Sequence, residues 1–318
     1  MENEALERSG SHFIIRFLRS DRGFSGHAII VLYFSPVDES GWKKTNSYHA
    51  LRRYKMKQDP PIMTTTHVPE RFPEIDFARG IAVIMMVVFH IVFDLYFLGI
   101  VPVPVSSPPW RLLALSTAGL FLFLVGVSLS ISAANARKTL SPYEFILKYV
   151  KRGAGIFAIA IGITLVTWLI LPGSFILFGI LHLIGLAVAL SPLYTGFSWQ
   201  NLVAGSVLIL LGPVAAALRG SGWLLWLGIH PSAFYSIDYT PVIPWLGVVL
   251  IGVYFGSLSY PGGIRRWNFA VPEILKGTFG FLGRHSLTVY LVHQPIILGI
   301  LFLIFPSVFM SLVVPGFL

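Results

Sequence analysis

The sequence predicts an all-α fold: a polytopic membrane helix bundle of about seven transmembrane helices, preceded by a poorly ordered N-terminal extension. Hydrophobic residues make up 55% of the chain and charged residues only 12%, whereas about 25% of the residues of a soluble domain are charged. Mean hydropathy is +0.76. The apolar residues form long runs, and the basic residues gather in the short loops between them, as in membrane proteins.

Seven apolar runs have about the length that a tilted helix needs to cross a bilayer. They lie at about residues 80–100, 112–132, 153–171, 175–193, 201–218, 241–258 and 286–305. The apolar piece at 223–229 is too short to cross. With Trp223, Trp226 and Tyr235 it predicts an interfacial or re-entrant segment.

Residues 1–66 differ from the rest of the chain, because they hold ten Lys/Arg and seven Asp/Glu but no apolar run long enough to span. Their short apolar stretches are too few for a core. We therefore expect 1–66 to be a weakly ordered cytoplasmic extension and 67–318 to be the transmembrane domain. The residues after Met63 read as a short leader into the first span, so Met63 is an alternative start; a genuine cytoplasmic tail is the other interpretation.

The basic residues also predict the orientation. With the N-terminus in the cytoplasm, eleven Lys/Arg between residues 71 and 284 lie inside, and only Arg111 and Arg219 lie outside. This is the bias of the positive-inside rule. Seven spans then place the C-terminus outside, and we expect a multi-pass protein of the plasma membrane.

The composition also excludes several kinds of chemistry. The chain has no cysteine, so it has no disulfide, thiolate nucleophile or cysteine metal site, and we expect no metal. The net charge of +9 follows from the loop residues and does not indicate nucleic acid. The expected partners are the lipid bilayer and a small acceptor, and a homo-oligomer is an open alternative.

A few polar residues interrupt the apolar spans and are candidates for chemistry, since titratable groups are costly at this depth. His90 lies eleven residues after Arg79, roughly 16 Å along a helix and close to the middle of the membrane. Asp94 follows one turn later on the same face. His182 lies in the fourth span, and Tyr290 and His293 share a face of the seventh with Ser286. We expect these side chains to converge.

The spacing of His90 and Asp94 predicts proton transfer. A carboxylate on one ring nitrogen would orient the imidazole and leave the other nitrogen to act on a hydroxyl or amine. In the alternative interpretation, each histidine simply bonds a neighbouring backbone carbonyl and Asp94 is solvated near the outer interface. His285 is interpreted as a helix-start residue.

The predicted cytoplasmic ends of the spans are basic. Arg79, Arg152 and Arg284 open three of them, with Lys151 beside Arg152. Such a cluster could bind the phosphates of a nucleotide-like donor. The positive-inside rule predicts the same residues without a ligand.

Five segments, in this order, resemble the prokaryotic members of the heparan-alpha-glucosaminide N-acetyltransferase catalytic-domain family: EIDFARGIAVIMMVVFHIVFDL, FLFLVGVSLSIS, FGILHLIGLA, DYTPVIPWLGVVLIG and GRHSLTVYLVHQPII. The resemblance covers about 70–305. The first span is also similar to that of the acyltransferase type three membrane enzymes, in which an arginine and an essential histidine have the separation of Arg79 and His90.

The resemblance implies a membrane acyltransferase that passes acetyl groups from cytosolic acetyl-CoA to an amino sugar or glycan on the far side. Combined with the polar positions described above, this activity leads us to expect His90, Asp94 and His293 in catalysis, and Arg79, Arg152, Arg284 and His182 at the donor. Asp238, on the predicted outer side, and Tyr290 would contact the acceptor, although Asp238 could equally cap the sixth helix. The loop 99–110 holds no histidine, in contrast to the animal enzyme, so direct attack with His90 as general base is preferred to an acetyl-histidine intermediate.

Two other classes of function remain open at this point. Histidines on facing helices can ligate a haem, which predicts a haem or quinone electron-transfer protein using His90, His182 and His293. A proton-coupled transporter using Asp94 ranks last, because no pair of spans resembles a broken inverted repeat.

Overall fold

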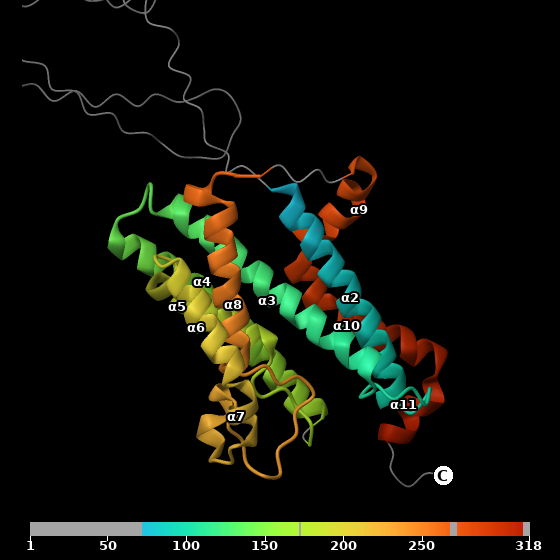
Figure 1. The fold of residues 1–318 in the computed structure, drawn as a ribbon. Coiled ribbons are helices and arrows are strands. Elements are labelled where there is room, and N and C mark those ends of the chain that lie inside the picture. Colours follow the sequence, from blue (N-terminus) through green and yellow to red (C-terminus); the bar gives the residue numbers. More distant parts are fainter. Residues whose placement is uncertain (1–71, 172, 268–271, 314–318) are drawn as a thin grey trace, which may run out of the picture. The chain divides into compact units, whose positions relative to one another are not determined.

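A computed structural model describes residues 72–171, 173–267 and 272–313. The predicted extension at 1–66, with Met63, lies outside these ranges. Within them the chain forms helices and no β-strand, which confirms the predicted fold class (Figure 1). The elements are α2 (Pro73–Phe97), α3 (Pro108–Ala136), α4 (Pro142–Ile170), α5 (Ile180–Tyr194), α6 (Trp199–Leu210), α7 (Gly212–Ala217), η1 (Gly222–Leu227), α8 (Val242–Ser259), η2 (Pro261–Gly263), α9 (Glu273–Arg284), α10 (Ser286–Ile304) and α11 (Pro306–Val313).

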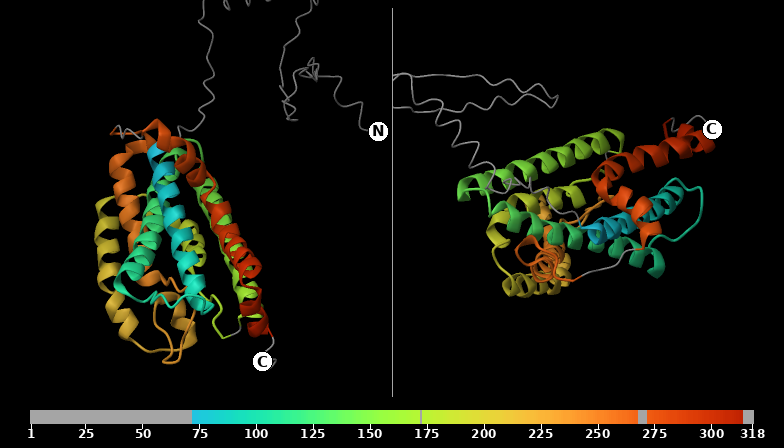
Figure 2. Two further views of the ribbon diagram at one scale, coloured as in Figure 1. Left: turned by 90° about the vertical axis from the view of Figure 1, so that its right-hand side faces the viewer. Right: turned by 90° about the horizontal axis from the view of Figure 1, so that it is seen from above.

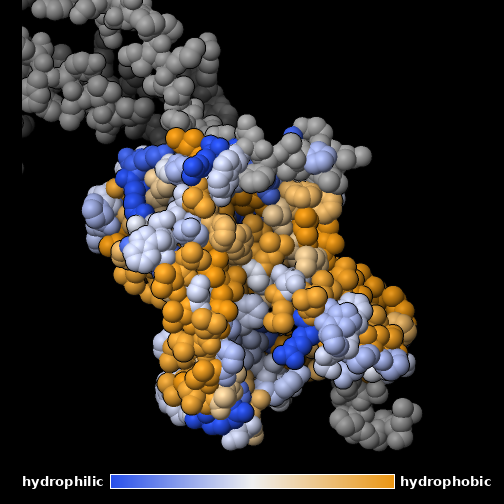
Figure 3. Space-filling model, in the orientation of Figure 1, coloured by the Kyte–Doolittle hydropathy of each residue, from blue (hydrophilic) through white to orange (hydrophobic). Residues whose placement is uncertain are grey.

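Six helical stretches in the described residues are long and apolar enough to cross a membrane: α2, α3, α4, the continuous α6–α7 stretch, α8 and α10. Hydrophobic residues cover much of their flanks, and hydrophilic residues gather mainly at the upper and lower ends (Figure 3). The long helices run lengthwise through the bundle (Figure 2). The protein is therefore a multi-pass membrane protein.

The fourth predicted span is shorter than expected. Its helix, α5, has 15 residues, fewer than the roughly 20 that a crossing needs. Residues 175–179 are not helical, because they pair with the segment that precedes α8. The Thr240 amide donates to the Phe178 carbonyl over 2.8 Å, and Phe178 forms an isolated parallel bridge with Tyr239. This pairing fixes the start of α5.

Three helices begin before the predicted spans. α2, α3 and α4 each start at a proline, in the first turn where a missing N–H costs nothing. Ser141 and Glu144 form a capping box at the start of α4. Hydropathy detects only the apolar part of such helices, and the first eleven residues of α4 hold Lys148, Lys151 and Arg152.

Close helix contacts are made by glycines. α3 crosses between the α2–α10 side of the bundle and the side formed by α4, α5, α6 and α8 (Figure 1). Gly126 of α3 lies against the backbone of α8 at Val249, and Gly252 of α8 lies against Phe123 of α3. The small residues of α3 and α8 therefore let the two backbones approach closely, as in other close-packed membrane helices.

The amphipathic helix α9 was not predicted. It packs along α2, where a Cβ added to Gly283 would overlap the Asp76 carbonyl and one added to Gly80 would overlap Phe279. This contact holds Arg284, the last residue of α9, beside the first turns of α2.

Candidate active site

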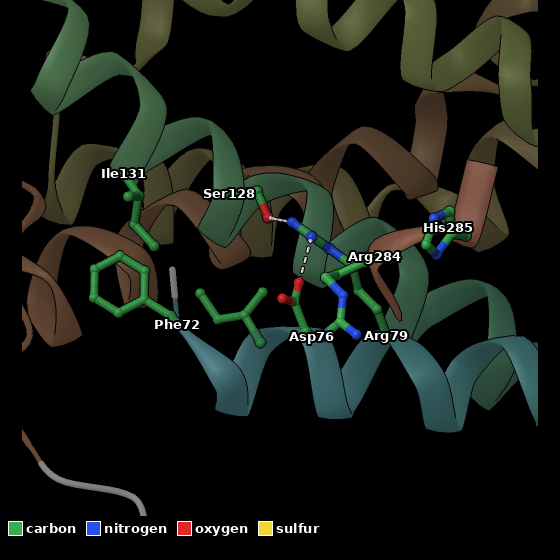
Figure 4. Close-up of a pocket in the computed structure, with 8 residues that line it drawn as sticks. Phe72, Asp76, Arg79, Ser128, Ile131, Arg284 and His285 are labelled. Atoms are coloured by element: carbon green, nitrogen blue, oxygen red, sulfur yellow. Dashed lines mark hydrogen bonds and ion pairs between the residues drawn. The ribbon is translucent and has the colours of Figure 1, made fainter. Parts of the chain in front are cut away.

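The cytoplasmic end predicted from the sequence contains a basic cavity of about 450 Å³ (Figure 4). Arg79 of α2 donates to Asp76 Oδ1 over 3.3 Å and to the Ser128 hydroxyl of α3. Arg284, the last residue of α9, also lines this cavity (Figure 4). The full lining is Phe72, Ile75, Asp76, Arg79, Ser128, Ile131, Arg284 and His285. Two arginines and one carboxylate leave the lining net positive, which suits an anionic group.

Polar contacts join the start of α2 to the segment that follows α8, next to the cavity-lining residue Phe72. Glu74 accepts from the Tyr260 hydroxyl over 2.8 Å and from Arg265 Nη2 over 3.0 Å. Arg265 also lies over the Phe72 ring. Burial, followed by the hydrogen bond to Glu74, raises the pKa of Tyr260. Arg265, which the sequence placed among the basic inner residues, is thus engaged in structure.

A second cavity of about 230 Å³ lies next to the first, since Arg79 and Ser128 line both. Arg152 of α4 and Ser286 and Tyr290 of α10 supply its other polar groups. The remaining lining is apolar: Phe121, Leu124, Val125, Leu129, Ile156, Leu181, Ile184, Val188 and Leu287. A basic cavity thus has a mainly apolar chamber as its neighbour.

A pair of histidines lies beyond this chamber, at the contact of α2 and α10. The rings of His90 and His293 meet edge to face, with centroids 4.7 Å apart, and the Tyr290 ring of the chamber wall is 5.7 Å from His293. His90 and His293 themselves line neither of the two cavities described above.

Both imidazoles present the same nitrogen for chemistry. His90 Nδ1 lies 2.8 Å from the Met86 carbonyl, and His293 Nδ1 lies 2.7 Å from the Tyr290 carbonyl. Because a carbonyl only accepts, each Nδ1 carries the hydrogen and the lone pair is on Nε2. His293 Nε2 is buried and has no hydrogen-bond partner among the described residues. A neutral imidazole held in this way can take a proton from a substrate.

Asp94 does not orient His90, so this part of the prediction was wrong. The Asp94 carboxylate is buried, and both of its oxygens accept from Gln294 Nε2 of α10 at 2.8 Å. The backbone carbonyl of Met86 takes the orienting place on His90 instead. Helical spacing put Asp94 on the correct face, but its partner comes from a helix 200 residues away.

His182 has a structural setting that differs from its predicted place at the donor. Its Nδ1 accepts from the Gly179 amide over 3.2 Å, so Nε2 carries the hydrogen and faces Thr164 Oγ1 at 3.3 Å. Phe157 and Phe178 enclose the ring. Both nitrogens are engaged, and His182 lines neither cavity described above.

Asp238 caps a helix, but α5 rather than the predicted α8. Its Oδ2 accepts from the Ile180 amide over 3.0 Å, and Oδ1 accepts from the Thr240 hydroxyl over 3.0 Å. Burial raises the pKa of this carboxyl, and the two hydrogen bonds act in the opposite direction. Both oxygens are engaged in structure, so an acceptor would have to compete with these bonds.

The structure therefore brings together two of the predicted groups. The two neighbouring cavities are lined by Arg79, Arg152, Arg284 and Tyr290. The contact between α2 and α10 contains His90, Asp94 and His293. His182 and Asp238 lie near each other at the start of α5. Sequence reasoning missed Ser128 and Gln294. Gln294 follows His293 directly within an apolar span, and a polar residue in such a position is a candidate functional residue that the sequence could have revealed.

In the part of the chain that the structure describes, no group of three or more His, Asp or Glu side chains could hold a metal ion. The haem alternative also has no support in this geometry. The edge-to-face contact of His90 and His293 leaves no room for an iron between them, and both nitrogens of His182 have partners.

The fold and the site define a class: an integral membrane helix bundle with a basic cavity at one end and proton-accepting imidazoles within the spans. The family model described as heparan-alpha-glucosaminide N-acetyltransferase, catalytic, matches residues 71–295. The chain belongs to this family, which makes it a membrane acyltransferase. A comparison with curated proteins found no match.

Proposed function

We propose that the protein transfers an acetyl group from cytosolic acetyl-CoA to a hydroxyl or amine of a sugar or glycan on the outer side of the membrane. Family membership supports acyl transfer. The distribution of basic residues supports a plasma-membrane orientation with the Arg79–Arg284 cavity in contact with the cytoplasm and the C-terminus outside.

The donor enters at the basic end in this proposal. Arg79 and Arg284 bind its phosphates, since guanidinium groups pair with phosphate oxygens through charge-assisted hydrogen bonds. The thioester arm extends past Arg79 into the chamber between α3, α4, α5 and α10, where Arg152 and Ser286 provide polar contacts. Tyr290 lines this chamber, and its ring lies 5.7 Å from the His293 ring, so the reacting end of the donor is placed at Tyr290, on the side of the histidine pair.

His90 is the general base of the proposed step. The acceptor oxygen or nitrogen attacks the thioester carbonyl carbon while its proton passes to His90 Nε2. The carbon–sulfur bond breaks, and the proton returns from the imidazolium to the departing thiolate, so the products are the acetylated acceptor and CoA. The His293 ring packs against His90 and holds it in the α2–α10 contact. General base catalysis of this kind contributes about 10²- to 10⁴-fold.

The observation that carries this proposal is the paired imidazoles, each with Nδ1 bonded to a backbone carbonyl. The test is transfer from radiolabelled acetyl-CoA to glucosamine and related sugars by the purified chain. We expect labelled sugar from the wild type and at least 100-fold less from His90→Ala, with unchanged thermal unfolding. Full turnover by His90→Ala would overturn the assignment of the base.

A further inference from the structure

Gln294 has two ends in different situations. Its amide nitrogen donates to both oxygens of Asp94 at 2.8 Å. Its carbonyl oxygen, Oε1, is buried and has no hydrogen-bond partner among the described residues. The Asp94 carboxylate is itself only 3% exposed. The Gln294 nitrogen is thus well hydrogen-bonded, whereas the buried oxygen of the same amide has no partner, and this difference needs an explanation.

The orientation of the amide follows from the chemistry of Asp94. Both oxygens of Asp94 accept hydrogen bonds, so the NH₂ group of Gln294 faces the carboxyl group. The carbonyl oxygen of the same amide then lies on the other side, away from Asp94. The hydrogen bonds to Asp94 therefore set the orientation of the Gln294 amide, and Oε1 is the atom on the side away from Asp94.

A second buried atom without a partner belongs to the residue that precedes Gln294. Among the described residues, three buried side-chain atoms lack a partner, and two of them, His293 Nε2 and Gln294 Oε1, belong to consecutive residues of α10. Both atoms are acceptors. A buried polar atom without a partner costs about 1–3 kcal/mol, and buried polar groups of native proteins are nearly always satisfied. A ligand that brings N–H or O–H donors would satisfy both of these acceptors, which consecutive residues of α10 carry.

We propose that Gln294 is a residue that selects the acceptor: its Oε1 accepts a hydrogen bond from a hydroxyl or amine of the acceptor, next to the histidine pair. This inference rests on the proposed acyl transfer, in which the acceptor must reach His90 and His293. A site built to receive a donor rejects analogues that lack it, because its own acceptor is then left unpaired.

The test compares Gln294→Met with the wild type, using the full chain in detergent and glucosamine as the probe. Methionine keeps the length of the side chain and removes the acceptor oxygen together with the hydrogen bonds to Asp94, both of which the Gln294→Glu variant described next retains. We expect the KM for glucosamine to rise about tenfold, with the Kd for CoA changed by less than twofold. We also expect the rise in unfolding temperature that glucosamine causes in the wild type to be lost in this variant.

Gln294→Glu is the conservative variant. A protonated glutamate donates its O–H to Asp94 and retains a carbonyl oxygen on the free side, so the KM for glucosamine should stay within about threefold of the wild type. Gln200→Met is the matched control, because Gln200 is an exposed residue at the start of α6. It should change none of these values.

The outcomes are separable. An unchanged KM and thermal shift in Gln294→Met would overturn the inference, and so would equal losses of CoA and glucosamine binding, which indicate a structural role. A wild type that glucosamine does not stabilise would overturn it as well. If glucosamine stabilises the wild type through Gln294 but receives no acetyl group, the role of Gln294 stands and the proposed transfer fails.

Discussion

Two histidine regions of this bundle have similar sequences around them and opposite environments. His182 lies in FGILHLIGLA and His90 in MMVVFHIVFD, both surrounded by apolar residues. His182 has a partner on each ring nitrogen, from Gly179 and Thr164, whereas His293, the neighbour of His90, has one nitrogen buried without any. An intramembrane histidine is therefore informative about function only when the bonds of both nitrogens are known.

We expect the largest loss of activity when one histidine of the His90–His293 pair is replaced. His293→Ala removes the ring against which His90 packs, and with it one of the two Nε2 atoms of the pair. We therefore expect kcat for acetyl transfer to fall at least about 100-fold. A radiolabel assay measures this loss, and circular dichroism shows whether the bundle remains folded. A folded variant with wild-type kcat would break the distinction between the two regions.

The next effect concerns the arginine shared by both cavities. Arg79→Ala removes charge-assisted bonds worth about 1.5–3 kcal/mol each, so the KM for acetyl-CoA should rise roughly 10- to 100-fold while kcat changes less. Initial rates at varied acetyl-CoA concentration give both values. Arg111→Ala, at the opposite end of α3, is the matched control, and an equal effect there would contradict a specific role of Arg79.

His182→Ala should lower stability rather than activity. It removes the bond to the Gly179 amide at the start of α5 and the contact with Thr164, with an expected loss of about 1–3 kcal/mol. Thermal unfolding in detergent measures this loss. Below the unfolding transition we expect kcat within about threefold of the wild type. A 100-fold loss of kcat without a loss of stability would instead support the original assignment of His182 to donor binding.

The smallest effect on activity is expected at Asp238, beside His182. Burial raises the pKa of this carboxyl above its ordinary value of about 4, so the folded state keeps a proton that the unfolded state loses. Stability contributed by this group is therefore full at low pH and falls as pH rises above about 4. Asp238→Asn should show a flatter dependence of unfolding temperature on pH, and identical profiles would show that another group is responsible.

The sequence predicted what depends on neighbours within one helix. Arg79 and His90 share one helix, α2, as predicted, and Ser286, Tyr290 and His293 share α10, as their spacing predicted. The membrane class and six of the spanning stretches follow from hydropathy alone. These inferences needed no knowledge of which helices meet.

What depends on contacts between distant segments was not predicted. The partner of Asp94 is Gln294, and Asp238 caps α5, which lies 58 residues earlier, rather than the helix that follows it. The shortened α5 results from pairing with residues near 240. In each case several partners satisfied the local pattern equally well, and tertiary packing decided between them.

The glycine contact between α9 and α2 sets two backbones directly against each other beside the basic cavity. No side chain stands between Gly283 and the Asp76 carbonyl, so no change of rotamer at this contact can shift one helix relative to the other. Arg284 follows Gly283 directly, and its exposed side chain lines the cavity. The contact therefore sets the position from which the Arg284 side chain extends, whereas the long side chain itself can change rotamer to meet an anion of a different size.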